Sequence, residues 1–200
     1  MNKPKSNKRN LIEWGIIIGI IAILYFTGLY TSVIGNLQRA ILWTGVIQPN
    51  TELPVNKQQN ANYFFYLSSI DGTPVSLSEF KGKTIFINFW ASWCPPCRAE
   101  MPTIQSLYDQ FKDKRIVFLM ISLDDNRIKP IDFVKKEGFT FPVFFLQDVV
   151  PIEYQTNTIP TTFVISPSGK IVFKEKGMAN YNTQKFRKML NKLINSSPHS

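Results

Sequence analysis

The sequence is almost without histidine and cysteine. Its 200 residues include one histidine, His199, and two cysteines, Cys94 and Cys97. A structural zinc site takes four ligands, so a single C-x-x-C pair cannot complete one. Two cysteines also cannot build a framework of several disulfides. We therefore expect no metal and no cofactor, and any special thiol chemistry must come from this one pair.

Acidic residues are also few. Lysine and arginine number 23 against 14 aspartates and glutamates, and the net charge is +9. The first 13 residues contribute +3 of this charge, from four cations and Glu13, which leaves +6 for the rest. No run of basic residues is interleaved with aromatics, so nucleic acid is not expected as a partner. The excess is typical of a solvated basic surface, or it favours acidic partners and anionic lipids.

Charge is absent from one long apolar run, Trp14–Tyr30. With its weakly polar continuation the run reaches the roughly 20 residues that cross a hydrocarbon layer. We predict a transmembrane anchor over residues 14–35, after a basic cytoplasmic tail over residues 1–13. Only Arg39 is basic between the run and Lys57, so the positive-inside bias places the remaining chain outside the cytoplasm. A cleaved signal peptide is the alternative, and it also exports the main domain.

The segment after the anchor is expected to connect it to the main domain. Leu37, Ile41 and Val46 lie largely on one helical face, which predicts a short amphipathic helix at the membrane surface. The following residues are polar, as in a linker. We assign residues 36–59 to this amphipathic segment and linker, residues 60–195 to the main domain, and residues 196–200 to a disordered tail.

Within the main domain, runs of β-forming residues alternate with helical periodicity. The sequence predicts strands over 63–70, 84–89, 116–122, 141–146, 161–165 and 170–174, and helices from the cysteine motif to about 112, over 130–136 and over 183–194. Thr183 is the expected N-cap of the last helix. This order predicts an α/β fold, a three-layer sandwich with a central mixed sheet.

The two cysteines stand in the sequence Cys94-Pro95-Pro96-Cys97. A disulfide between residues so close closes a very short loop, and the stabilisation from chain entropy is then smallest. Redox chemistry is the interpretation that remains.

The position of the pair in the predicted fold supports redox chemistry. The motif directly follows a buried strand, so Cys94 falls at the start of a helix, where unpaired amides and the helix dipole lower the pKa of a thiol. Pro95 and Pro96 suit the first helical turn, because its amides have no intrahelical acceptor. We expect Cys94 to attack the substrate, and Cys97, one turn further and less exposed, to resolve the mixed disulfide.

The segment Phe89 to Cys97, FWASWCPPC, resembles the active site of the thioredoxin superfamily. Its continuation Arg98 to Pro102, RAEMP, is similar to the membrane-anchored TlpA/ResA branch of thiol-disulfide oxidoreductases. The likeness covers about residues 60–194 and implies a thioredoxin-like fold. Pro102 corresponds to the proline that kinks the active-site helix in this superfamily. A proline inside a helix otherwise costs about 3 kcal/mol, so its presence here predicts a kink.

The resemblance also implies a substrate-binding edge. Ile159 and Pro160 match the cis-proline segment that faces the cysteines and pairs with the substrate chain. Together with Trp93 and Pro95 they are the expected substrate-binding residues. An ordinary trans proline that opens a strand is the alternative.

Glu100 matches the acidic residue that the ResA-like branch carries three positions after its second cysteine. The resemblance implies that it shuttles a proton or tunes the thiols, whereas a solvated surface glutamate is the alternative. Thioredoxins carry a buried aspartate six residues before the first cysteine, and this sequence has Asn88 there. An amide cannot hold a proton, so more of the expected proton handling falls on Glu100.

These observations predict an enzyme of the bacterial cytoplasmic membrane with its catalytic domain on the periplasmic side. We expect it to reduce disulfides of exported proteins. The resemblance implies apocytochrome c as one substrate, in cytochrome c biogenesis, and a membrane-embedded electron donor. A copper-delivery or oxidase-assembly chaperone with a thioredoxin fold is the alternative from another class, and a binding module with idle chemistry is a third.

Overall fold

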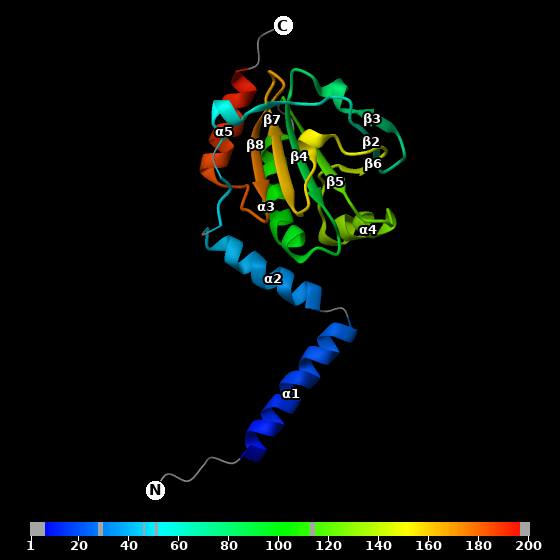
Figure 1. Cartoon of the computed structure of the whole chain (residues 1–200), viewed down its shortest axis with the longest axis vertical. Helices are drawn as coiled ribbons and strands as arrows, with labels where there is room; N and C mark the ends of the chain where they lie inside the picture. The colour runs from blue at the N-terminus through cyan, green and yellow to red at the C-terminus, as the bar shows by residue number, and fades with distance from the viewer. Residues whose placement is uncertain (1–6, 28–29, 46, 51, 113–114, 197–200) are drawn as a thin grey trace.

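The structure is a computed structural model that describes residues 7–27, 30–45, 47–50, 52–112 and 115–196 (Figure 1). The basic tail up to residue 6 and the predicted disordered tail from residue 197 lie outside the described residues. Two helices precede the main domain, α1 (Asn7–Phe26) and α2 (Tyr30–Trp43). In the figure α1 extends away from the domain, whereas α2 lies close to it.

The two N-terminal helices differ from the single anchor predicted over residues 14–35. Helix α1 already begins in the basic tail and ends at Phe26, and α2 begins at Tyr30. Phe26 is followed in the sequence by a threonine and a glycine, which are weak helix formers that a hydropathy average does not detect. No helix in the described ranges combines the length and apolar content that crossing a membrane requires. The predicted span is therefore not confirmed.

A mixed sheet forms the centre of the domain. In the described part of the chain it has eight strands in the order β1-β8-β7-β4-β5-β6-β2-β3. Strand β4 pairs in parallel with β5 and antiparallel with β7, so the predicted mixed sheet is confirmed. The strands are β1 (Gln59–Asn60), β2 (Tyr66–Ser69), β3 (Pro74–Ser76), β4 (Thr84–Trp90), β5 (Ile116–Ser122), β6 (Val143–Leu146), β7 (Thr161–Ile165) and β8 (Lys170–Lys176).

Three longer helices of the domain follow the predicted order. They are α3 (Pro95–Phe111), α4 (Ile128–Glu137) and α5 (Gln184–Asn195), with short 3-10 turns η1 (Val55–Lys57), η2 (Leu77–Phe80) and η3 (Ile152–Tyr154). Thr183 caps α5 as predicted, because its Oγ1 accepts a hydrogen bond of 3.2 Å from the amide of Phe186.

The two faces of the sheet are covered differently. Every residue of β4 is buried, and successive side chains point to opposite faces. Phe86 and Trp90 face an apolar cluster to which α3, α4 and α5 all contribute. Among the described residues the cluster on the other face, around Ile87 and Phe89, contains no α-helical residue; Phe65 and the turns η2 and η3 cover it. A helical layer is therefore found on one face only, whereas the three-layer sandwich expects helices on both.

Helix α2 packs against the amino end of α3 (Figure 1). Gly35 is buried, and a Cβ at this position would lie 3.7 Å from the carbonyl oxygen of Pro95. Leu42 is fully buried, and its carbonyl accepts a hydrogen bond of 3.4 Å from Asn180 Nδ2. The segment that the sequence predicts as a membrane-surface helix is thus seated on the domain.

The predicted linker also contacts the domain. The amide of Leu53 donates a hydrogen bond of 2.6 Å to Val172 in β8, and β1 pairs with the same strand. Because β1 spans Gln59 and Asn60, part of the expected linker belongs to the sheet. The division of the chain into anchor, linker and domain otherwise stays a prediction.

Candidate active site

The cysteine pair lies where β4 leads into α3, and the two sulfurs form a disulfide. Cys94 is the N-cap of α3, and its Sγ accepts a hydrogen bond of 3.3 Å from the amide of Cys97. Pro95 and Pro96 occupy the first two helical positions, as predicted. A sulfur at this place is surrounded by the partial positive charge of a helix amino terminus. The geometry therefore favours negative charge on Cys94 once the disulfide is reduced.

Both cysteine residues are less exposed than the sequence suggests. Cys94 is 3% exposed and Cys97 is 0% exposed, so the expected difference between them is small. The neighbouring Trp93, in contrast, is 59% exposed. A substrate must therefore approach the pair closely, and Trp93 offers the large apolar contact beside it.

The Ile159–Pro160 loop faces the pair. The peptide bond between these residues is cis, as predicted. Cys94 Sγ lies 3.9 Å from the carbonyl oxygen of Ile159. The loop is held by the amide of Gly177, which donates to the Pro160 carbonyl at 2.8 Å, and by Thr161 Oγ1, which donates to the Thr158 carbonyl at 2.6 Å. The backbone before the proline is thus fixed next to the reacting sulfur.

Glu100 is a buried residue and not a surface glutamate. It lies on α3 one turn after Cys97 and is 0% exposed. Asn88 Nδ2 donates to its Oε1 at 2.8 Å, and the amide of Ala179 donates to its Oε2 at 3.1 Å. Burial raises the pKa of Glu100 to about 8, although both hydrogen bonds lower it and the charge of Glu175 raises it slightly further. At neutral pH most Glu100 carboxyls are therefore protonated and a minor fraction is ionised.

Asn88 holds Glu100 in place and does not handle protons itself. It is fully buried in β4, and Nδ2 also donates to Thr162 Oγ1 on β7 at 2.9 Å. The sequence shows Asn88 only as a departure from the thioredoxin pattern. The sequence does contain a signal for this role, because a polar residue within an otherwise apolar strand needs a buried hydrogen-bond partner.

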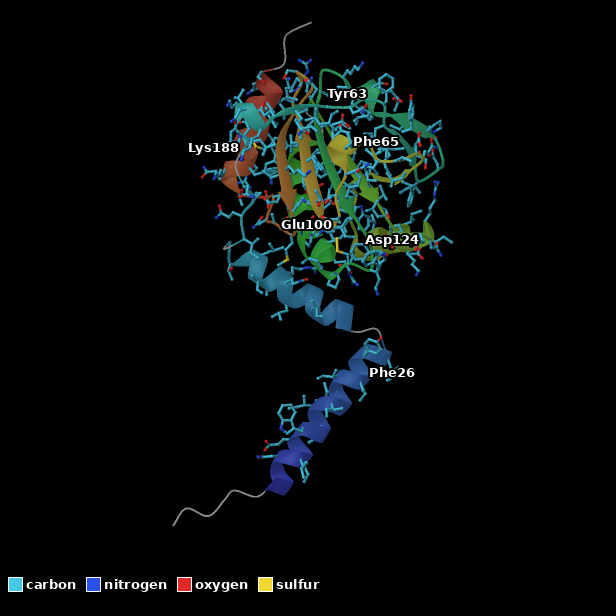
Figure 2. The ribbon with its side chains drawn as sticks, in the orientation of Figure 1. Phe26, Tyr63, Phe65, Glu100, Asp124 and Lys188 are labelled. Carbon is cyan, nitrogen blue, oxygen red and sulfur yellow. A yellow bond between two sulfur atoms is a disulfide. The ribbon has the colours of Figure 1, made fainter. Side chains whose placement is uncertain are left out.

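Asp124 is a further residue of the site, and no sequence pattern predicted it. Its carboxylate accepts hydrogen bonds from the amide of Ser92 at 2.8 Å, from Ser92 Oγ at 2.6 Å and from Ser122 Oγ at 2.9 Å. Ser92 lies two residues before Cys94, so Asp124 fixes the loop that carries the attacking sulfur. Asp124 lies two residues after the end of β5, whose partner strand β4 leads into the same loop. Figure 2 shows Asp124 and Glu100 near the same end of the domain, the end nearest α2.

Within the described residues, no three side chains of histidine, cysteine, aspartate or glutamate lie close enough together to hold a metal ion.

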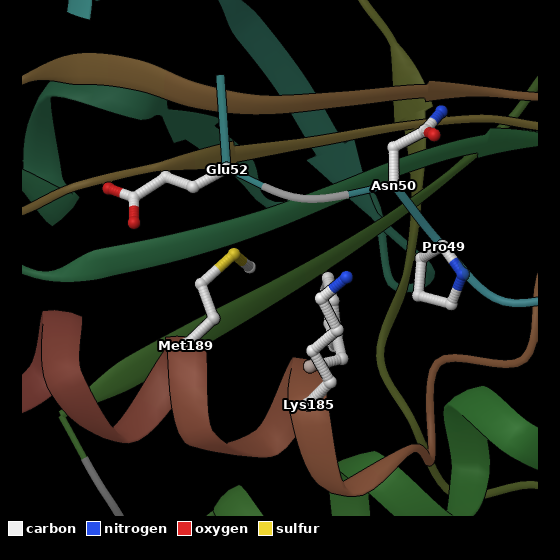
Figure 3. Close-up of a pocket in the computed structure, with 6 residues that line it drawn as sticks. Pro49, Asn50, Glu52, Lys185 and Met189 are labelled. Atoms are coloured by element: carbon white, nitrogen blue, oxygen red, sulfur yellow. The ribbon is translucent and has the colours of Figure 1, made fainter. Parts of the chain in front are cut away.

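A separate cavity of about 230 Å³ lies between α5 and the segment before η1 (Figure 3). Pro49, Lys185 and Met189 contribute to its walls, and the carboxylate of Glu52 lies 3.6 Å from Lys192 Nζ. Among the residues that the structure describes, none that lines this cavity belongs to the cysteine site.

Known proteins are similar to this chain in both sequence and fold. Residues 56–174 match the AhpC/TSA family. The thiol-disulfide oxidoreductase ResA of Bacillus subtilis is 31% identical over 169 residues, which cover 84% of this chain and 85% of that protein. The protein of the same name from Oceanobacillus iheyensis is 39% identical over 174 residues, 85% of this chain and 83% of the relative.

Solved structures agree with this similarity. StoA from Bacillus subtilis is 29% identical with a TM-score of 0.52, and the match covers 64% of this chain and 93% of that one. A thiol:disulfide interchange protein of the thioredoxin family from Chlorobium tepidum has a TM-score of 0.55 at 24% identity, over 74% of this chain and 97% of that one. The predicted thioredoxin-like fold is confirmed.

Proposed function

The chain belongs to the AhpC/TSA family and is a thiol-disulfide oxidoreductase, and from this premise we propose that it reduces the disulfides of exported proteins. One observation carries the proposal. Cys94 Sγ caps the amino end of α3, accepts the amide of Cys97, and faces the carbonyl of Ile159. This arrangement favours a thiolate next to a backbone edge that can hold a substrate chain.

The reaction begins from the reduced pair. The Cys94 thiolate attacks one sulfur of the substrate disulfide, and the other substrate sulfur leaves and takes up a proton. Cys97 then loses its proton and attacks Cys94 Sγ, which breaks the mixed disulfide and releases the second substrate thiol. The substrate gains two electrons and two protons, and the enzyme is left with the Cys94–Cys97 disulfide seen in the structure.

We assign Glu100 to the proton transfer that accompanies the second step. It lies one turn after Cys97 on the same helix, and its pKa of about 8 is close to a working pH near neutrality. A group of this kind can both take and return a proton. Asn88 acts through Glu100, as a positioning residue.

Substrate binding is assigned to the surface around Cys94. The fixed backbone of Ile159 and Pro160 lies on one side of the sulfur, and the exposed Trp93 and the half-buried Pro95 flank it in sequence. An extended segment of substrate can pair with the Ile159 backbone while its apolar side chains contact Trp93.

The proposed partners follow from the resemblance to the ResA-like branch. Apocytochrome c is one proposed substrate, beside other exported proteins with disulfides, and a membrane-embedded protein is the proposed electron donor. Each turnover leaves the enzyme oxidised, so a donor of two electrons is required.

We place the domain outside the cytoplasm, with the N-terminal segment attached to the bacterial cytoplasmic membrane. Two observations support this placement. Four cations precede the apolar run, and most apolar side chains of α1 are exposed, with Trp14 and Ile18 both at 63%. Protease added to intact spheroplasts should then digest the domain. Protection of the domain until the cells are lysed would contradict this location.

Trapping with Cys97→Ser tests the function itself. The variant keeps the attacking sulfur but cannot resolve the mixed disulfide, so substrate proteins should stay attached to Cys94 until dithiothreitol releases them. The matched control Cys94→Ser should retain none. Equal amounts of adduct on the two variants would refute the order of attack and with it the proposed mechanism.

A further inference from the structure

A groove of about 320 Å³ lies directly beside the cysteine pair. Ser92 and Arg98, which stand just before and just after the motif, form one wall. The other wall comes from α4, through Lys129, Phe133 and Lys136. The groove thus begins at residues that flank the cysteine motif.

The groove carries an excess of positive charge. Arg98, Lys129 and Lys136 face it, together with the carboxylates of Asp132 and Glu137. Glu137 Oε2 is also 3.6 Å from an Arg39 guanidinium nitrogen on α2. Asp124 is hydrogen-bonded to Ser92 of the wall. With Arg39 and Asp124 included, four cations stand against three carboxylates, which leaves an excess of one positive charge.

One of these cations is held in a fixed position. The guanidinium carbon of Arg98 lies 5.0 Å from the centre of the Phe133 ring, and Phe133 packs in turn on Trp90 with ring centres 5.8 Å apart. A guanidinium is planar, and its donors suit the two oxygens of a carboxylate. Lys129 and Lys136 are exposed and add longer-range attraction.

Hydrogen bonds fix the two wall residues Ser92 and Arg98 relative to the loop that carries Cys94. The amide of Arg98 donates a hydrogen bond of 3.1 Å to the carbonyl of Cys94, and Ser92 is fixed by Asp124. A substrate chain whose disulfide reaches Cys94 therefore lies next to the Ile159 backbone. The groove begins close to this place, at the residues that flank the cysteine motif.

We propose that this groove recognises acidic residues next to the target disulfide, so that the preferred substrates are proteins whose reactive cysteine is flanked by aspartate or glutamate. The inference rests on the proposed function and specifies its substrate class. An exposed ion pair changes an affinity by up to about fivefold, so the groove should give a preference of roughly threefold to tenfold.

Three matched peptides test the preference. Each contains one intramolecular disulfide, and they differ only in two flanking residues, which are Glu, Gln or Lys. The full chain in non-ionic detergent, reduced beforehand and freed of excess reductant, should reduce the Glu peptide in a single turnover with a second-order rate constant about three to ten times that of the Gln peptide, and the Lys peptide more slowly than either. Salt at about 1 M should remove most of the difference.

Two variants locate the preference in the groove. Lys129→Gln combined with Lys136→Gln should abolish most of it, whereas Asp132→Asn should increase it. The control pair Lys185→Gln with Lys188→Gln lies on α5, away from the groove, and should leave the preference unchanged (Figure 2). All variants should reduce 2-hydroxyethyl disulfide, which has no charge, at the rate of the unmodified chain.

The neutral probe separates the two possible failures. If 2-hydroxyethyl disulfide is reduced but the Glu and Gln peptides react equally fast, the groove does not select acidic segments and only this inference is wrong. A preference that persists in the Lys129 and Lys136 variant also overturns it. If the unmodified chain does not reduce the neutral probe, the proposed function fails, and this inference fails with it.

Discussion

Replacement of Glu100 by glutamine should remove a large pH dependence of stability. In the folded protein burial raises the pKa of this carboxyl from 4.5 to about 8. Between these two values the unfolded chain has lost the proton, whereas the folded chain still holds it. Stability therefore falls as the pH rises from about 4.5, and it levels off above about pH 8.

The size of the effect follows from the shift. One pKa unit corresponds to about 1.4 kcal/mol, so the full shift makes the folded state about 5 kcal/mol less stable at high pH than at low pH. Between about pH 5 and pH 8.5 the change is about 4 kcal/mol. This is a large share of the 5 to 15 kcal/mol that typically stabilises a domain.

Glu100→Gln keeps the shape of the side chain but cannot ionise. One of the two donors, Asn88 Nδ2 or the amide of Ala179, then meets an NH₂ group and loses its acceptor. This loss costs about 1 to 3 kcal/mol and is the same at every pH. The pH dependence of the difference between the two proteins is therefore the diagnostic quantity.

Denaturant unfolding of the oxidised full chain measures this difference. The disulfide keeps both cysteines from titrating, and groups other than Glu100 cancel between the two proteins. The unfolding free energy of the unmodified chain minus that of Glu100→Gln should fall by about 4 kcal/mol from about pH 5 to pH 8.5. Asp148→Asn, at an exposed carboxylate, is the control and should show no such change. A difference that stays constant within about 1 kcal/mol, or that rises, would refute the assignment of a buried, neutral Glu100.

Three further predictions use the same site. Reduced Cys94 should react with iodoacetamide with a midpoint at least about one pH unit below the 8.5 of an ordinary thiol, and a normal profile would contradict the activation of this sulfur. Asn88→Leu should move the pH-dependent step of Glu100 upward, because a hydrogen bond that lowers the pKa is lost; a step that stays in place would show that Asn88 does not tune it. Asp124→Ala should lower the unfolding free energy by about 2 to 4 kcal/mol in urea titrations and slow turnover, whereas an unchanged midpoint would show that the loop does not depend on this carboxylate.

Much of the fold follows from local sequence patterns. The apolar run of β4, the periodicity of α5 and the cap at Thr183 all predict elements that the structure contains. These features depend on residues close together in the chain. The placement of Cys94 at the start of a helix is predictable for the same reason, because a strand and two prolines surround it.

The unpredicted part of the site depends on distant residues. Whether Glu100 is buried depends on Ala179, which is 79 residues away, and on the neighbouring strand that carries Asn88. Asp124 meets Ser92 across 32 residues. Helical spacing alone places Glu100 on a face of α3 but cannot say what covers that face. The packing of α2 on the domain is likewise a tertiary contact, and the hydropathy of the sequence does not predict it.

The docking of α2 also limits how far the cysteine pair can travel. A free tether of residues 36–59 could stretch to about 80 Å, and the domain would then sample a large volume around its point of attachment. With α2 seated on α3, the disulfide instead stays within a short distance of the end of α1. If α1 is held at a lipid surface, as proposed, the local concentration of the enzyme at that surface is high, and proteins that pass further out are beyond its range. The enzyme is then suited to substrate proteins that emerge at the membrane.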